Sequence, residues 1–248
     1  MVVLGVTVSR LRAAYTSIAR PRLVSIDMER NPITIPPAVI HTKLVSFQNV
    51  PADSQPDTFI EAIRLGLKLF DTESKLLSDE ALNVSAVGLL DTPPLPAHAG
   101  SGRGTSLDLI KLHAIVSHEI RKEFRLPVSS FSIGSARFAL GISDATASDA
   151  KRGMIAQFKE AVLNRDDTST VSGYQAMAES WSVSVALERA RLLSELKHLF
   201  PGMVERARVD VSRRKVFQKS DVVKVKDSVI SQLVDAEVDK LLIKRFNL

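Results

Sequence analysis

Positive charge is concentrated in one stretch near the end of the sequence, between residues 206 and 226. Basic side chains in such a segment can neutralise backbone phosphates and release counterions, which is how proteins bind nucleic acids. Phe217 lies among them and could stack on an unpaired base. We therefore predict a nucleic-acid-binding segment, with RNA the favoured partner. Its expected contact residues are Arg206, Arg208, Arg213, Arg214, Lys215, Phe217, Lys219, Lys224 and Lys226.

The distribution of charge sets this segment apart from the rest of the chain. The net charge is +5. Residues 205–226 alone contribute +5, and residues 1–26 contribute four arginines and no acid, so the remainder is slightly acidic. Concentrated positive charge is typical of proteins with an anionic partner. Two other interpretations stay open: a solvated loop whose charges pair with the acidic middle of the chain, or a surface that binds anionic lipids.

A second candidate anion site is the glycine-rich stretch "GSGRGTS", residues 100–106. Flexible glycines before a helix leave backbone N–H groups free to bind an anion, and Arg103 adds a positive charge. The Gly-Lys pair of a phosphate-binding P-loop is absent, so nucleotide hydrolysis is not expected. A plain linker is the simpler interpretation, with Arg103 as an additional nucleic-acid contact if the stretch binds.

Residue types that usually carry catalysis or bind metals form no recognisable pattern. The sequence has no cysteine, which excludes thiolate ligands, cysteine nucleophiles and disulfides. His113 and His118 are five residues apart and do not share one face of a helix. Asp166 and Asp167 fit a turn that follows a helix. We therefore predict no catalytic residue, no metal site and no small-molecule cofactor, although a scattered active site would leave no such pattern.

Hydrophobic spacing and turn residues predict an α+β fold with a mixed α/β portion at residues 1–95 and a mainly helical portion at residues 96–248. The first strand, at 2–8, should be followed by a short basic helix, and Gly134-Ser135 should turn a hairpin within 129–143, with a short helix as the alternative. The other strands are expected at 22–28, 32–35, 42–50 and 81–90, and the helices at 54–79, 106–124, 148–164, 172–200 and 220–246.

These features together favour a non-enzymatic structural protein, similar in kind to a viral nucleocapsid or matrix protein. It would bind nucleic acid through the basic segment and self-associate through its C-terminal helices, in the cytoplasm or a virion. The alternatives are a peripheral membrane or assembly protein, and an enzyme whose site the sequence does not reveal. The arginines of residues 1–22 also resemble a mitochondrial targeting segment, but a strand is the favoured interpretation.

Overall fold

The computed structural model describes residues 2–19, 39–74, 84–91, 103–142, 146–162, 171–212 and 227–246. The chain forms two compact units, one made of residues 1–20 and 37–188 and the other of residues 21–36 and 189–248. The division expected after residue 95 lies in the first unit, in a stretch outside the described residues. Among the described residues, no helix is both long and apolar enough to cross a membrane.

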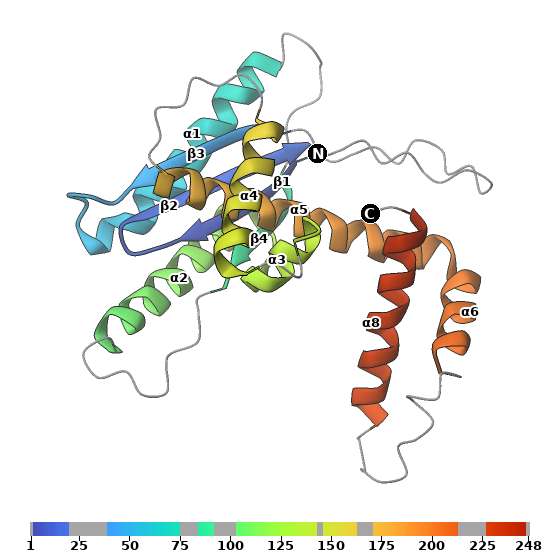
Figure 1. Ribbon diagram of the computed structural model, residues 1–248. Helices are drawn as coiled ribbons and strands as arrows, with labels where there is room; N and C mark the ends of the chain where they lie inside the picture. Colours follow the sequence, from blue (N-terminus) through green and yellow to red (C-terminus); the bar gives the residue numbers. More distant parts are fainter. Residues whose placement is uncertain are drawn as a thin grey trace. The chain divides into compact units, whose positions relative to one another are not determined.

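The first unit is built on a five-stranded mixed sheet with the order β3-β2-β1-β4-β5. Strands β1, β2 and β3 form an antiparallel meander, whereas β4 and β5 run parallel to β1. This architecture confirms the predicted α+β class (Figure 1). The strands are β1 (Val2–Val8), β2 (Arg12–Ala19), β3 (Val39–Ser46), β4 (Val84–Leu90) and β5 (Val128–Phe131).

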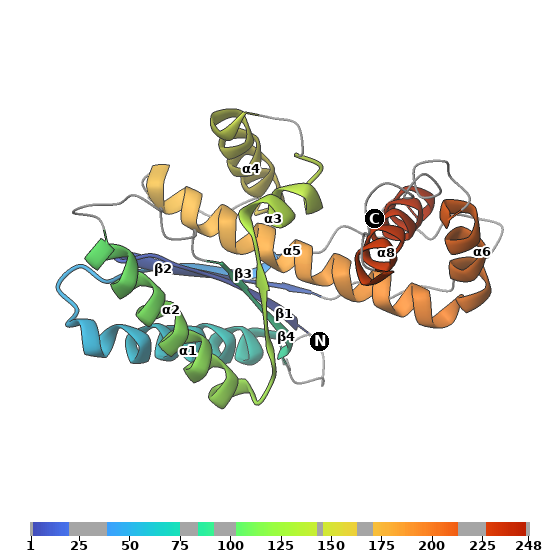
Figure 2. The same cartoon turned by 90° about the horizontal axis from the view of Figure 1, so that it is seen from below.

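Helices cover both faces of this sheet, as Figure 2 shows. On one face, α1 (Gln55–Ser74) and α2 (Arg103–Phe124) pack on alternate residues of β1, including Leu4 and Val6. On the other face, α4 (Ala147–Ala161) and the first part of α5 (Val171–Leu199) pack on Val3, Ala14 and Ile18. Because successive side chains of a strand point to opposite faces, β1 is buried on both sides.

Two expectations for the first unit are wrong. The segment after β1 is the strand β2 rather than a basic helix, because it pairs with both β1 and β3 and buries Tyr15 and Ile18. At 129–143 the expected hairpin is wrong and the alternative, a short helix, is confirmed, because β5 is followed by α3 (Ile133–Ala139). Ser132 caps this helix by accepting a hydrogen bond from the backbone N–H of Ser135 at 3.0 Å.

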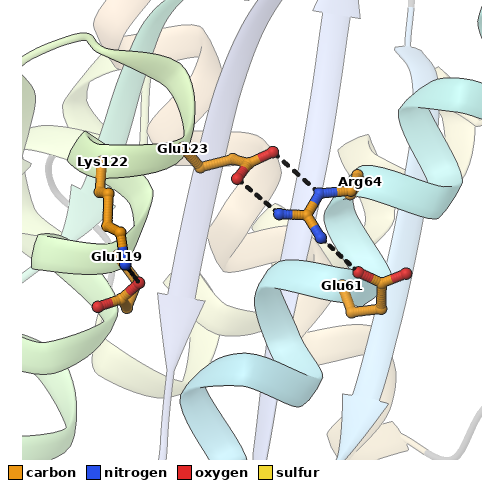
Figure 3. A network of polar contacts seen from close by, with 5 residues as sticks. All are labelled: Glu61, Arg64, Glu119, Lys122 and Glu123. Atoms are coloured by element: carbon orange, nitrogen blue, oxygen red, sulfur yellow. Dashed lines mark hydrogen bonds and ion pairs between the residues drawn. The ribbon is translucent and has the colours of Figure 1, made fainter.

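An ion-pair network joins α1 to α2 at their outer sides (Figure 3). The guanidinium of Arg64 donates two hydrogen bonds to Glu123, at 3.0 and 2.7 Å, and one to Glu61 at 2.7 Å. These interactions raise the pKa of Arg64 and lower the pKa of Glu123. Since the charges satisfy one another and lie in solvent, we interpret this network as a clamp between two helices rather than as a site.

The second unit contains the end of α5 with α6 (Pro201–Ser212) and α8 (Asp227–Phe246). Its small core consists of Leu196, Val238 and Leu242. Lys197 pairs with Asp239, and Arg208 pairs with Asp235 at 2.6 Å. The strands expected at 22–28 and 32–35 lie outside the described residues.

Candidate active site

The carboxyl ends of the three parallel strands meet at one edge of the sheet. Thr7 lies near the end of β1, Asp91 follows β4, and Ser132 follows β5. The backbone N–H of Asp91 donates to the carbonyl of Phe131 at 2.8 Å, which holds the ends of β4 and β5 together. Crevices outside the carboxyl ends of parallel strands are the usual ligand sites of such sheets.

A cavity of about 210 Å³ opens at this edge between the β1–β2 hairpin and α5. The hairpin contributes Thr7, Ser9 and Arg12, and the first half of α5 contributes Gln175, Ala176 and Glu179. The lining therefore combines hydroxyl groups, an amide, one acid and one base. Such a set of polar groups in a concave site is suited to binding a small polar or charged group.

Glu179 is the partly buried acid of this cavity. Burial raises the pKa of its carboxyl group above the ordinary value, because a low-dielectric environment disfavours the charged form. A hydrogen bond from Gln175 Nε2 to Glu179 Oε1, 2.8 Å long, opposes that rise. A carboxyl group with a raised pKa in a cleft is the arrangement that general acid–base catalysis uses.

Three basic residues from three different elements surround Glu179. Lys151 of α4, Arg137 of α3 and Arg12 of β2 each stabilise the carboxylate form through their charge. Arg137 Nε is buried and has no hydrogen-bond partner among the described residues. The three positive charges exceed the one negative charge of Glu179, so the site has a surplus that favours an anionic ligand.

His113 and Asp91 form a second pair of titratable groups near the same edge. Burial lowers the pKa of His113 on α2, and the nearby charge of Asp91 opposes that shift. The alternation of β1 places α2 and α5 on opposite faces of the sheet, so His113 and Glu179 approach the edge from opposite sides.

A seam of hydroxyl groups holds α5 against the sheet and thereby fixes Glu179. Thr16 Oγ1 lies 2.7 Å from Ser180 Oγ and 2.9 Å from Thr42 Oγ1. Ser184 Oγ donates to the carbonyl of Thr16 at 2.8 Å. At the same place Gly5 lets α5 approach β1 closely, since a Cβ on Gly5 would lie 2.1 Å from the carbonyl oxygen of Ser180. Glu179 is the neighbour of Ser180 in the chain, so this seam sets its position.

Because of Glu179, the free energy of unfolding should decrease as the pH rises above about 4.5. Its folded-state pKa lies above the ordinary value of 4.5, so the unfolded chain loses this proton first as the pH rises. The free energy of unfolding should therefore fall as the pH rises from about 4.5 through the raised pKa. Urea unfolding of the wild type and of Glu179→Gln across this range would measure the effect, and the variant should show a smaller fall in the free energy of unfolding.

The control is Glu160→Gln, which changes an exposed acid of α4. Its free energy of unfolding should fall as much as that of the wild type. An equal fall in Glu179→Gln would contradict the assignment.

The predicted binding residues are only partly described. Arg103 is the first residue of α2, so the helix begins three residues earlier than expected. Arg206 and Arg208 lie on α6, where Arg206 Nε donates to the carbonyl of Gly202 and Arg208 pairs with Asp235. The others lie outside the described residues, namely Arg213, Arg214, Lys215, Phe217, Lys219, Lys224 and Lys226.

Sequence reasoning missed Glu179, Gln175, Arg12, Arg137 and Lys151, which are far apart in the chain. The available signal was a single charged residue in a stretch of small and apolar residues, "QAMAESWSVSVA" at 175–186. In the part of the chain that the structure describes, no group of three or more His, Cys, Asp or Glu residues is placed to hold a metal ion.

Comparison with known proteins gives similarity of structure only, because the sequence matches no protein-family model and no curated protein. Thermus thermophilus RuvC has a TM-score of 0.48 at 11% identity, covering 77% of this chain and 96% of that chain. A fowlpox virus resolvase, solved with its substrate Holliday junction DNA, has a TM-score of 0.40 at 12% identity, covering 77% and 99%. The yeast mitochondrial Holliday junction resolvase Ydc2 has a TM-score of 0.41 at 15% identity, covering 79% and 80%.

These comparisons contradict the prediction of a non-enzymatic structural protein similar to a viral nucleocapsid or matrix protein. Of these three structures, the fowlpox virus and yeast proteins are resolvases, and the fowlpox virus protein was determined with its substrate. Their low identities and TM-scores assign neither an activity nor a substrate to this chain. The cavity beside Glu179 is therefore the feature of this chain that bears on its function.

Proposed function

We propose that this chain is an enzyme that hydrolyses phosphodiester bonds of DNA at the cavity beside Glu179. The observation that carries the proposal is a partly buried acid with a raised pKa, placed at the carboxyl ends of the parallel strands among Arg12, Arg137 and Lys151. An acid–base group next to a surplus of positive charge is what attack on a phosphodiester needs. DNA replaces RNA as the proposed partner.

The proposed reaction uses Glu179 as the general base. Its carboxylate accepts a proton from a water molecule, whose oxygen then forms a bond to phosphorus. The bond from phosphorus to the leaving sugar oxygen breaks, and that oxygen takes up a proton from solvent. Arg12, Arg137 and Lys151 offset the negative charge that develops on the non-bridging oxygens.

Many nucleases position two metal ions with clustered carboxylates. The described residues do not fit such a centre, since they contain no group of three or more metal-ligating side chains. The steps above therefore involve only side chains of this chain and water.

The proposal is tested by incubating the protein with an end-labelled four-way DNA junction and with a linear duplex of the same sequence. The junction is the first probe because two similar structures were determined with Holliday junction DNA. We expect labelled fragments from at least one of these DNAs, produced faster as the pH rises and Glu179 ionises. DNA that is bound in a gel-shift assay but never cut would overturn the proposal, and so would DNA that is not bound.

The basic segment 205–226 is proposed as a second contact with DNA, through residues other than those that line the cavity. Changing Arg213, Arg214 and Lys215 together to Ala should weaken DNA binding for all sequences alike. The slope of log affinity against log salt should become shallower by roughly 2–3, because each lost phosphate contact removes about 0.9. Fluorescence anisotropy at several salt concentrations measures both effects. The control is Lys43→Ala with Lys68→Ala and Arg121→Ala, which removes the same charge from exposed positions of β3, α1 and α2. An unchanged slope in the segment variant would exclude these three contacts.

A further inference from the structure

The helix α2 carries several apolar side chains that the fold leaves in solvent. Its core side, with Leu112, Val116 and Ile120, is buried against the sheet. Elsewhere on the same helix Leu107 is 48% exposed and Ile115 is 49% exposed. Figures 1 and 2 show α2 at the border of the first unit, with α1 as its neighbouring helix. Exposed apolar side chains on one helix are typical of an interaction surface.

Charged residues are arranged symmetrically in sequence around Ile115. Asp108 lies seven residues before it and Lys122 seven after it, whereas Lys111 lies four before and Glu119 four after. At about 100° per residue, all four lie within roughly 40° of Ile115 around the helix axis. The five residues therefore share one face of α2, which we call the Ile115 face.

The order of these charges has a consequence for two copies of α2 packed side by side. In an antiparallel pair centred on Ile115, Asp108 lies opposite Lys122 of the second copy, and Lys111 lies opposite Glu119 of the second copy. By two-fold symmetry every such pair occurs twice, which gives four pairs of opposite charge around two isoleucines. In a parallel pair each residue would instead meet its own copy, and like charges would repel.

We propose that the protein forms a two-fold symmetric dimer through antiparallel packing of the Ile115 face. The occupant of this face is a second copy of the chain because the charges are complementary to themselves, pair by pair. Ile115 supplies the apolar centre, and the charged pairs fix register and orientation more than they add affinity.

The charged side chains of the face are available for such contacts. Lys122 has a side chain 73% exposed, and its ion pair with Glu119 in the same helix is 3.6 Å long, which makes it weak. Figure 3 shows these two side chains next to each other on α2. Lys122 can therefore turn to an acid on a second copy at little cost. This proposal is independent of the proposed catalytic activity and places self-association on α2 rather than on the C-terminal helices.

Sedimentation velocity of the full chain over a range of concentrations tests the dimer. The wild type should dimerise, and Lys122→Asp should raise the dissociation constant at least tenfold by placing two acids opposite each other. The double variant Asp108→Lys with Lys122→Asp restores opposite charges in both pairs, so its dissociation constant should return to within about threefold of the wild-type value.

The matched control is Arg121→Asp, the same change of charge one residue away and about 120° around the helix from Ile115. It should leave the dissociation constant unchanged, and circular dichroism should show that every variant is folded. Ile115→Asp, which removes the apolar centre, should give monomers. A monomeric wild type, a double variant that stays as weak as Lys122→Asp, or a dimer that survives Ile115→Asp would each overturn the proposal.

Discussion

Glu179→Gln should lower the rate of DNA cleavage by a factor of about 10²–10⁴, the usual contribution of a general base. Gln has the same size and keeps an oxygen that can accept the hydrogen bond from Gln175, so the cavity should keep its shape. The affinity for DNA should change little, because Arg12, Arg137 and Lys151 remain in place. Single-turnover cleavage and gel-shift titration would measure the two effects separately.

A merely structural role for Glu179 would give a different result. It would lower the melting temperature and the affinity together with the rate, whereas a general base affects mainly the rate and its dependence on pH. Glu160→Gln is the matched control, because Glu160 is an exposed acid of α4 outside the cavity. Cleavage by Glu179→Gln at the wild-type rate would show that the base is another residue.

Gly5→Ala should destabilise the first unit by about 1–3 kcal/mol or more, because the added methyl group has no space. A Cβ at this position would lie 2.1 Å from the carbonyl oxygen of Ser180 and 2.6 Å from the backbone N of Ser184. Both are backbone atoms of α5, so the helix itself would have to move away from β1. The same movement would displace Glu179, and cleavage should fall more than the loss of folded protein explains.

The matched control is Gly153→Ala in α4, the same substitution in the same unit. Its nearest neighbour would be Ile142 Cδ1 at 3.6 Å, an ordinary contact. Because alanine favours a helix interior over glycine by roughly 0.5–1 kcal/mol, this variant should be slightly more stable than the wild type. Thermal unfolding of both variants measures the difference. Equal melting temperatures would mean that α5 does not depend on close contact at Gly5.

The sequence predicted those elements whose pattern is local. The β-branched run at 2–8 and the stripes of α1, α2, α4 and α5 each follow from spacing within one segment, and the structure confirms them within a few residues. The strand β2 could not be predicted in this way, because "RAAYTSIA" has little strand character of its own and depends on pairing with β1 and β3. At α3, alternation suggested a hairpin, but the cap at Ser132 favours a helix.

The candidate site escaped prediction for a physical reason. Glu179 is unusual only because burial raises its pKa, and burial exists only in the folded chain. Arg12, Arg137 and Lys151 come from three separate elements, so no spacing in the sequence links them to Glu179. The charges of the basic segment 205–226, in contrast, are close together in the sequence itself, so they could be recognised without the fold.

The place of β1 in the sheet constrains how the protein can fold. This strand is the centre of the sheet, between β2 and β4. Since Val2 of β1 pairs with Val84 of β4, the ribosome synthesises β4 much later than β2. The hairpin with β2 can close at once, because only a short turn separates the strands. The parallel partner β4 emerges roughly eighty residues later, and closing so long a loop is slow. Until then one edge of the most apolar strand stays unpaired, so a nascent chain is most exposed to aggregation before β4 arrives.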